Sequence, residues 1–560
     1  MKEAIKNKKV MKLWLAVLVT LSCTLSAFAQ EEKWGEGEIQ SVEIEIVKDR
    51  QISLPKANRN FEKVPPRAAE PIRPEITYDL KTFNFNSGDY NPAIRPLKLK
   101  QEELTKIYGN YLSAGLGNYS SPYAELYLNS KRDKSKFYGA HFYHHSFGKG
   151  PVDGKNSASG NTSVDLFGKF FSSAVTTSAF LNYDKRTGYF YGYPKNGIEV
   201  DRNDIKQSYD VVSLGGELEN SKPADFNFKL SGGLSYLQDY YDAKESEVSL
   251  GWKSDYKISE KSGLIFNANY FVIARKDLLT DAKPRNLLKF NPAYRFYPLD
   301  KLKLTIGLNA VLESDKIANK SLHVYPDVWA NYELAQSVEA YAGLTGDIDK
   351  VSLHTLSAEN LWLNSNIDIE HTSRSADFRV GIKGKVVKKL AFDAGFSVAN
   401  LKNLYFYQNN LTDPSKFDVI YDAGSTQRLN LFVDLGMNFA DKARLNVRGD
   451  YFGYSTDEQA EAWHRPTYRL AFNSYFNIYS KLTLHADLIT QGGMKALDVV
   501  NSKTITLDPA VDLNAKLSYF VSKQFSIFLK FNNVLSNKYP VYFNYPVRGF
   551  QAMGGISWSF

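Results

Sequence analysis

The sequence has almost no cysteine and, beyond its first 29 residues, no long apolar run. A single cysteine, Cys23, excludes an intrachain disulfide. No uninterrupted apolar stretch after residue 29 approaches the ~20 residues that a membrane-spanning helix needs. Strong charge of either sign is also missing, because the formal net charge is only +8 over 560 residues. This balance gives no reason to expect a nucleic-acid partner.

The first 29 residues have the three parts of a secretory signal peptide. Residues 2–12 carry five lysines and one glutamate, an apolar run follows to about Ala27, and a small-x-small site ends at Ala29. We expect residues 1–29 to be a signal peptide whose cleavage lowers the formal net charge from +8 to +4. A membrane anchor would need a longer apolar run, and the residues before Cys23 are a poor lipidation site.

Residues 30–105 differ from the rest of the chain. They hold seven of its 20 prolines and show no helical apolar stripe. We interpret them as a Pro-rich extended arm on the periplasmic side. Their one strand-like run alternates apolar and acidic residues, and it is Val42, Glu43, Ile44, Glu45, Ile46 and Val47.

From about residue 107 onward, apolar and polar residues alternate with a period of two. The clearest runs are 302–310, 482–488 and 511–519. The chain is also rich in aromatics, with 36 Tyr and 35 Phe. Both features are typical of transmembrane strands that face lipid on one side and a wet lumen on the other. A large soluble β-sandwich or propeller is the alternative.

The connections between these runs decide between a transmembrane barrel and a soluble β protein. Tight turns such as 260–262 and 480–481 alternate along the chain with longer loops such as 347–373 and 408–416. Short periplasmic turns and long external loops produce this alternation, whereas a soluble sandwich has no reason for it. We predict an all-β, antiparallel transmembrane β-barrel of about 22 strands over residues 106–560. Its even strand number leaves both chain ends in the periplasm.

The last predicted strand ends with aromatics at alternate positions. Gly555, Trp558 and Phe560 form a pattern similar to the signal that the outer-membrane barrel assembly machinery recognises by strand addition. The simpler interpretation is an ordinary last strand that carries an aromatic girdle. A terminal Phe behind a signal peptide favours the assembly signal, and with it a location in the bacterial outer membrane.

A family resemblance lies just before this strand. The run 531–539 (FNNVLSNKY), then a short loop and Arg548-Gly549-Phe550, is similar to the end of TonB-dependent receptors of the Bacteroidota type. The order Arg-Gly departs from the family's Gly-Arg. The resemblance implies a 22-stranded outer-membrane barrel.

The globular plug domain of that family is missing, because residues 30–105 are too few and too rich in proline. Something else should therefore occupy the lumen. Inward-folded loops, of which 347–373 is the longest candidate, the N-terminal arm, and a partner protein are the options. The resemblance also implies that Val42–Val47 is a docking strand for TonB or another periplasmic protein. A disordered acidic arm is the alternative for that segment.

Three histidines form the one histidine cluster. On a strand, His141 and His145 share a face and His144 points the other way, which breaks a three-ligand metal site. We therefore interpret them as lumen or rim residues and expect no metal and no cofactor. We find no catalytic triad or carboxylate pair in a recognisable context, so we expect no enzyme.

Two aromatic clusters, 189–193 and 405–407, lie at predicted loop bases. They suit either stacking platforms for sugars or an aromatic girdle facing the lipid, and we favour the girdle. Lys303 and Lys516 fall on lumen faces, as a solvated wall or a source of mild anion selectivity.

Two functions remain open. The first is transport or uptake of a nutrient by a plugless relative of TonB-dependent receptors. The second is a non-transporting barrel subunit that scaffolds an outer-membrane complex through its arm and loops.

Overall fold

The computed structural model describes residues 108–560 except 132, 195–198, 280–282, 387–388 and 441. The predicted signal peptide, the arm and its docking strand Val42–Val47 lie outside the described residues and stay predictions. Within the described part of the chain, no helix is long and apolar enough to cross a membrane.

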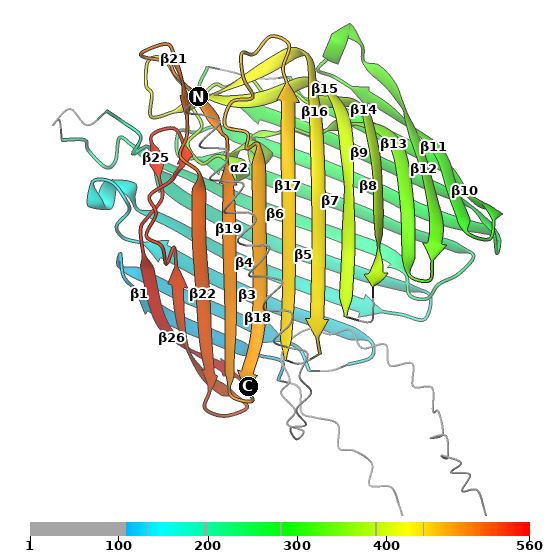
Figure 1. Ribbon diagram of the computed structural model, residues 1–560, viewed down its shortest axis with the longest axis horizontal. Helices are drawn as coiled ribbons and strands as arrows, with labels where there is room; N and C mark the ends of the chain where they lie inside the picture. Colours follow the sequence, from blue (N-terminus) through cyan, green and yellow to red (C-terminus); the bar gives the residue numbers. More distant parts are fainter. Residues whose placement is uncertain (1–107, 132, 195–198, 280–282, 387–388, 441) are drawn as a thin grey trace, which may run out of the picture. The chain divides into compact units, whose positions relative to one another are not determined.

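The described residues form a closed antiparallel barrel of 22 strands (Figure 1). Each strand pairs with its sequence neighbour in the barrel, and the last strand pairs with the first. The barrel strands are β1 (Tyr111–Gly117), β2 (Ser121–Asn129), β3 (Lys136–Phe147), β4 (Ser159–Phe171), β5 (Val175–Tyr189), β6 (Lys206–Asn220), β7 (Phe226–Asp239), β8 (Lys244–Ser259), β9 (Ser262–Lys276), β10 (Arg285–Leu299), β11 (Leu302–Glu313), β12 (Leu322–Ala335), β13 (Val338–Asp349), β14 (Thr372–Val386), β15 (Leu390–Asn409), β16 (Phe417–Phe439), β17 (Ala443–Ser455), β18 (Tyr468–Tyr479), β19 (Leu482–Gly492), β22 (Ala510–Phe520), β23 (Phe525–Asn532) and β26 (Gln551–Ser559). The predicted fold class and strand number are confirmed.

Smaller elements lie in the connections. They are the 3-10 turns η1 (Gly154–Ser157) and η2 (Ile317–Asn319), the helix α2 (Leu353–Glu359), the hairpin β20 (Lys495–Asp498) and β21 (Lys503–Thr506), and the hairpin β24 (Pro540–Tyr542) and β25 (Tyr545–Pro546).

Alternation along each strand separates an apolar outer face from a polar inner face. On β11, Ile306 and Leu308 are exposed on the outside, while the side chain of Asn309 points inward and donates to the Gly346 carbonyl at 2.6 Å. Exposed leucine and aromatic side chains recur at this parity around the barrel. Exposed apolar side chains in such a band are what a lipid-facing surface requires.

The two ends of the barrel differ as the sequence predicts. Both chain ends of the barrel meet at one end, where Asn110 and Phe560 exchange backbone hydrogen bonds of 3.2 and 3.0 Å. The connections at this turn end are short: 130–135, 172–174, 221–225, 260–261, 300–301, 336–337, 387–389, 440–442, 480–481 and 521–524. Most connections at the opposite loop end are longer: 118–120, 148–158, 190–205, 240–243, 277–284, 314–321, 350–371, 410–416, 456–467, 493–509 and 533–550.

One hairpin extends further than its sequence pattern indicates. The period-two pattern predicts strands over 390–405 and 425–439, but β15 continues to Asn409 and β16 begins at Phe417. The added residues pair at the loop end, where other loops cover them. The lipid–lumen alternation that marks a strand in the sequence is therefore lost there.

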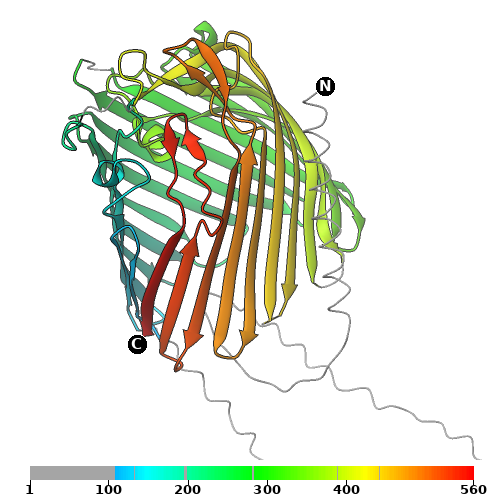
Figure 2. The same ribbon diagram turned by 60° about the vertical axis from the view of Figure 1, so that its left-hand side comes forward.

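The predicted C-terminal signal lies at the seam of the barrel, where the last strand pairs with the first. β26 lies between β23 and β1 (Figure 2). Trp558 and Phe560 are exposed on the outside, and their rings are stacked at 4.5 Å. Gly555 faces inward under the ring of Phe528, where a Cβ atom would lie 2.2 Å from the ring. The glycine is thus needed for this close approach. Recognition of this strand by the assembly machinery stays a prediction.

Candidate functional site

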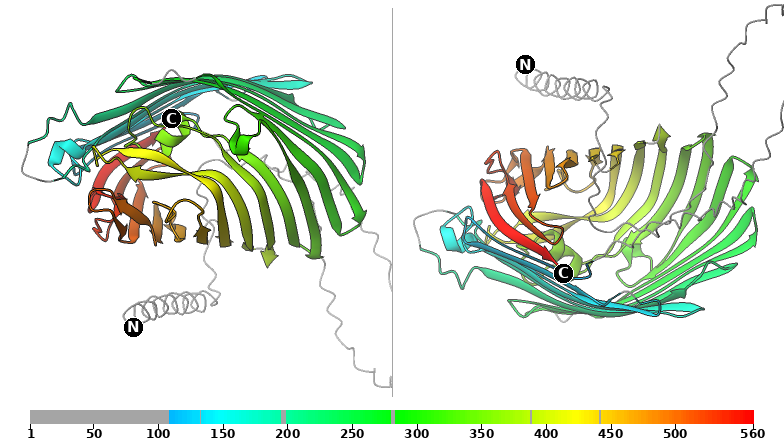
Figure 3. Two further views of the ribbon diagram at one scale, coloured as in Figure 1. Left: turned by 90° about the horizontal axis from the view of Figure 1, so that it is seen from above. Right: turned by 90° about the horizontal axis from the view of Figure 1, so that it is seen from below.

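The connection between β13 and β14 folds into the barrel lumen. We call residues 350–371 the inward segment. It contacts side chains or backbone of β5, β8, β10 and β16, which lie on different sides of the closed barrel. Views along the barrel show α2 inside the ring of strands (Figure 3). Of the three occupants considered for the lumen, the inward-folded loop at 347–373 is therefore present, whereas the N-terminal arm lies outside the described residues.

Charged residues from two strands hold α2 at both of its ends. At the first turn, Glu245 of β8 accepts hydrogen bonds from the backbone N–H groups of Leu353 and His354, at 2.8 and 2.9 Å. At the last turn, Arg186 of β5 donates to the carbonyl of Ser357 at 2.7 Å. An anion at the first turn and a cation at the last turn both match the helix dipole. The barrel wall therefore fixes where this short helix lies.

The local sequence starts the helix at Ser352. Its hydroxyl accepts from the N–H of Thr355, and the Thr355 side chain accepts in return from the N–H of Ser352. This capping box defines the first helical residue. A helix of seven residues is too short to be stable alone, so its contacts with the wall must stabilise it.

Replacing Glu245 by Gln should loosen α2. A carboxamide has one acceptor oxygen in place of two, and it removes the charge that faces the helix dipole, which costs about 1–3 kcal/mol. We expect amide hydrogen exchange of Leu353 and His354 to accelerate by about 5- to 100-fold. Glu219→Gln, on the lumen face of β6 and remote from α2, is the matched control. Equal exchange rates in both variants would contradict the role of Glu245.

An apolar cluster surrounds the inward segment. Leu353, Leu356 and Leu363 are at most 3% exposed. Burial of each such side chain contributes about 1.5–3 kcal/mol. They pack with buried residues from the strand ends and from other loops: Val152, Tyr191, Tyr209, Val211, Leu237, Ala243, Tyr407, Phe417, Val419, Tyr542 and Tyr545. The loop end of the lumen therefore has a hydrophobic core of its own.

The two aromatic clusters of the sequence belong to this region. Phe190 and Tyr191 are buried, as are Phe406 and Tyr407. Tyr191 and Tyr407 join the apolar cluster around the inward segment, and Phe406 packs with Trp463 in a neighbouring one. The prediction of a lipid-facing girdle is wrong for these residues. They lie where several loops converge, so loop packing rather than lipid determines their environment.

Trp362 joins the inward segment to the end of β5 and to the connection 533–550. Its indole N–H donates to the carbonyl of Tyr189 at 2.9 Å, and its ring lies 4.1 Å from that of Tyr545. The neighbouring Leu361 approaches β5 so closely that a Cβ atom at Gly188 would lie 2.3 Å from it. A larger residue at this position would therefore require the Leu361 side chain to shift.

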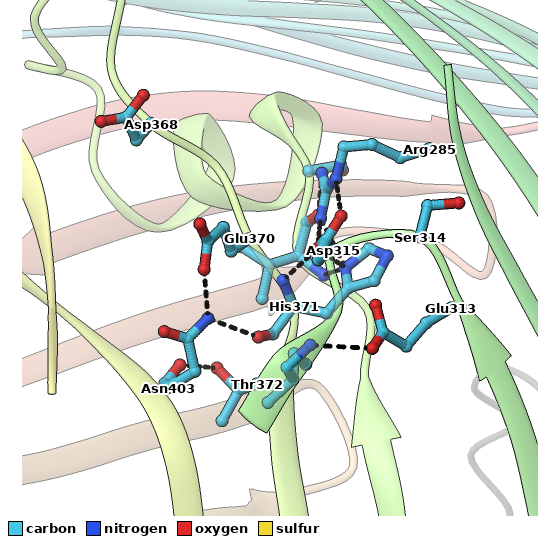
Figure 4. A network of polar contacts seen from close by, with 12 residues as sticks. Arg285, Glu313, Ser314, Asp315, Asp368, Glu370, His371, Thr372 and Asn403 are labelled. Atoms are coloured by element: carbon cyan, nitrogen blue, oxygen red, sulfur yellow. Dashed lines mark hydrogen bonds and ion pairs between the residues drawn. The ribbon is translucent and has the colours of Figure 1, made fainter. Parts of the chain in front are cut away.

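A largely buried ion pair fixes the far end of the inward segment (Figure 4). Arg285 of β10 binds both carboxylate oxygens of Asp315, at 2.8 and 2.6 Å, and donates to the carbonyl of Val351 at 3.0 Å. Nδ1 of His371 accepts from Arg285 at 2.8 Å and from the Val351 N–H at 3.1 Å. Asp315 in turn accepts from the His371 N–H at 2.8 Å. Both ends of the segment thus meet at one guanidinium.

A bulge in β15 adds a second contact to the same end. Asn403 has a φ of 57° and interrupts the register with β16. Its amide group donates to Glu370 and to the carbonyl of His371, both at 2.9 Å, and its own carbonyl accepts from Thr372 at 3.0 Å. Asparagine tolerates this left-handed conformation better than most residues do. The bulge therefore directs a polar side chain at the segment (Figure 4).

The ionisable groups of this network have shifted pKa values. Burial and the nearby Arg285 lower the pKa of His371 from 6.5 to about 3, although Asp315 acts in the opposite direction. Burial tends to raise the pKa of Asp315, but the hydrogen bonds and charge of Arg285 outweigh it and lower that pKa. Asp315 is therefore ionised and His371 neutral at pH 7, as their hydrogen bonds require.

The lumen wall beside the inward segment is polar. A cavity of about 510 Å³ lies against strands β8 to β13, and its lining consists of amide, ammonium and carboxylate groups: Lys253, Asn267, Asn269, Lys289, Asn291, Asn309, Asp327 and Asp347. Lys289 and Asp347 form an ion pair at 2.8 Å. Such a wall can accommodate a hydrated polar solute, and an apolar solute would gain little from it.

The histidine cluster divides between two faces, as its spacing predicts. His141 contacts Asp165 at 2.8 Å, and His145 contacts Ser121 at 3.0 Å. His144 contacts Thr162 at 2.9 Å from the other face of β3. Among the described residues, no group of three or more His, Cys, Asp or Glu side chains is placed to hold a metal. Of the lumen lysines singled out in the sequence, Lys516 lies 4.9 Å from the Phe528 ring centre.

The closed ring of strands, its seam and its inward segment define the chain as a 22-stranded antiparallel barrel with part of its own chain inside. Its fold is that of the 22-stranded TonB-dependent siderophore receptors. The siderophore receptor PirA from Acinetobacter baumannii is similar with a TM-score of 0.62 and 11% identity, over 80% of this chain and 80% of that one.

Two further solved structures show the same likeness. The ferric-catecholate import receptor Fiu from E. coli has a TM-score of 0.60 and 9% identity, over 81% of this chain and 82% of that one. The ferripyoverdine receptor of Pseudomonas aeruginosa has a TM-score of 0.59 and 12% identity, over 82% of this chain and 72% of that one. No family model and no curated protein matches the sequence.

Proposed function

We propose that this protein is an outer-membrane uptake barrel, with both chain ends in the periplasm, whose lumen is closed by its own inward segment. One observation carries the proposal. The inward segment is held by Glu245, Arg186 and Arg285, while a polar cavity lies against the wall beside it. An apolar closure and a polar chamber are the two parts that a gated passage for polar solutes needs.

The likeness to import receptors supports a transport role over a catalytic one. The competing function is that of a scaffold, and conductance measurements in planar bilayers decide between uptake and the scaffold. The docking strand Val42–Val47 would serve either function, by binding TonB or another periplasmic protein. Deleting residues 30–105 tests it, since an unchanged set of co-purifying proteins would contradict docking.

Removing the inward segment should open the barrel. Asp349 and Thr372 are already paired across β13 and β14, so an Asn-Gly linker can replace residues 350–371 with a two-residue turn. In planar bilayers we expect the intact protein to be silent or to open briefly. The shortened variant should conduct continuously, because the apolar cluster loses its central residues.

Removal of the β20–β21 hairpin is the matched control. This hairpin lies at the same end of the barrel and belongs to a separate apolar cluster of Met494, Ala496 and Leu507. We expect the control to remain as silent as the intact protein. Continuous conductance of the intact protein would contradict the proposal that the inward segment closes the lumen. Silence of all three proteins, with specific proteins co-purifying, would favour the scaffold over uptake.

A further inference from the structure

A groove lies on the outer face of the barrel at its seam. Its volume is about 280 Å³, and β1, β23, β26 and the turn 521–524 contribute its lining: Leu112, Ala114, Ser522, Gln524, Phe525, Ile556 and Trp558. β1 and β26 lie side by side there (Figure 1). The lining thus joins the first strand of the barrel to the last two.

The apolar part of this seam groove faces lipid. Ile556 and Trp558 are exposed on the outside, and Ala114 and Leu112 lie directly opposite them in the register of β1 and β26. Ala114 is small beside these larger neighbours, which leaves a depression between them. In the apolar band of a membrane barrel, hydrocarbon rather than water fills a depression. The surroundings therefore limit its occupant to an acyl chain or an apolar side chain of another protein.

One end of the seam groove is polar and lies at the turn end of the barrel. Ser522 and Gln524 line it, and Lys523 between them is exposed. Within the described part of the chain, Lys523 forms no ion pair and the side-chain amide of Gln524 forms no hydrogen bond. The hydroxyl of Ser522 accepts from the N–H of Phe525 at 3.0 Å, which leaves its own proton to donate. Ammonium, amide and hydroxyl donors therefore stand beside hydrocarbon, as a phosphate headgroup requires.

The turns around the seam carry an excess of positive charge. The turn 480–481 adjoins the turn 521–524, because the carbonyl of Lys481 accepts from the N–H of Phe520 at 2.7 Å. The turn 130–135 lies on the other side of the seam. The described charged side chains of these three turns are four lysines and one aspartate: Lys131, Lys134, Lys481, Lys523 and Asp133. A positive rim beside an apolar groove favours an anionic lipid over a neutral one.

The strands at the seam are the shortest of the barrel. β1 has seven residues and β23 has eight, against 20 for β15 and 23 for β16. A strand tilted as in an outer-membrane barrel needs about 9–11 residues to cross the hydrocarbon. The bilayer must therefore adapt at the seam. A lipid that contacts β1, β23 and β26 together would also stabilise a region with few inter-strand hydrogen bonds.

We propose that the seam groove binds an anionic phospholipid of the periplasmic leaflet, and that this lipid stabilises the seam. One acyl chain lies on Ala114 and Ile556, and the headgroup phosphate accepts from Lys523, Ser522 and Gln524. The choice of leaflet rests on the proposed orientation, in which the turn end faces the periplasm. The proposal goes beyond solute uptake, because the lipid binds the outside of the barrel and needs neither the inward segment nor an open lumen.

Native mass spectrometry of the intact protein, released from detergent, tests the site with phosphatidylglycerol as the probe. We expect one tightly retained phosphatidylglycerol per chain and several-fold weaker retention of zwitterionic phosphatidylethanolamine. K523Q should weaken the affinity about fivefold, because a lysine beside anionic lipid contributes about that factor. A114F should weaken it about tenfold or more, because the added ring fills the place of the acyl chain.

K222Q and A179F are the matched controls. Lys222 lies in the turn 221–225 and Ala179 on the outer face of β5, both exposed and remote from the seam. We expect both variants to keep the affinity within about twofold, and heat-modifiable migration in gels to show that every variant is folded. Amide hydrogen exchange of β1 should slow several-fold when phosphatidylglycerol is added to the intact protein, but not when it is added to A114F.

Four results would overturn the proposal: no retained phosphatidylglycerol, equal retention of phosphatidylethanolamine, equal losses in A114F and A179F, or unchanged exchange of β1. A dimer of the chain that A114F abolishes would assign the seam groove to a second copy instead. Conductance of the variant that lacks residues 350–371 is a separate result, so uptake and lipid binding can fail independently.

Discussion

Arg285→Ala should detach the inward segment from the wall and produce the largest loss of closure of any single substitution. Arg285 is the common partner of Asp315, His371 and the Val351 carbonyl. Removing one member of a buried ion pair leaves the other charge without compensation, which costs about 3–5 kcal/mol. The docking equilibrium should therefore fall by a factor of about 100 or more. Hydrogen exchange across 350–371 and channel openings in bilayers are the measurements.

Arg285→Lys separates charge from geometry. A lysine keeps the positive charge, but it cannot bind both oxygens of Asp315 and also reach His371, because it lacks the planar fork of donors. We expect an intermediate exchange rate and brief openings. A silent Arg285→Ala channel with unchanged exchange would show that the apolar cluster alone closes the barrel.

Acidification should also release the inward segment from the barrel wall and so open the lumen. His371 has a pKa of about 3 when docked, against 6.5 for a free histidine, because it is buried and lies beside Arg285, with Lys289 and Lys350 adding positive charge and Asp315 opposing them. The docked state binds fewer protons than the released state. Docking is therefore at full strength above about pH 6.5 and weakens as pH falls toward about 3. At pH 5 the loss is on the order of 2 kcal/mol, or about thirtyfold.

The open probability in bilayers should therefore rise steeply between pH 6.5 and pH 5. Asp315 cannot cause this effect, because its lowered pKa keeps it ionised throughout that range. His371→Asn is the control, since its side-chain oxygen can accept the same hydrogen bonds without titrating. A pH response that persists unchanged in this variant would assign it to another group. His464 is the next candidate, because burial lowers its pKa to about 4.

The sequence predicts the barrel far better than the closure. Period-two runs such as 302–310 and 482–488 correspond to β11 and β19, because lipid on one side and a wet lumen on the other impose opposite demands on alternate residues. That signal ends where the strands leave the lipid. The extension of β15 to Asn409 and the hairpins at 495–506 and 540–546 therefore leave no mark in the pattern.

The contacts that hold the inward segment in the lumen cannot be predicted from the sequence, for a different reason. The connection 347–373 can be recognised as long, and inward folding is one of the three ways in which the lumen is expected to be occupied. Its partners cannot be found in the same way, because Arg186 and Ser357 are 171 positions apart and Glu245 and Leu353 are 108 apart. A charged residue on a lumen face has the same local pattern whether it binds water or a helix end. Only the three-dimensional register of the closed barrel brings these groups together.

The helix clamped between β5 and β8 also has a mechanical consequence. A wide ring of hydrogen-bonded strands resists stretching along its circumference, but little resists flattening of its cross-section. The inward segment is joined to several strands of the wall, so it should stiffen the cross-section of the barrel against lateral pressure from the bilayer. When the gate is released, the barrel should therefore become softer as well as open, and spin labels facing each other across the lumen should report a broader range of separations.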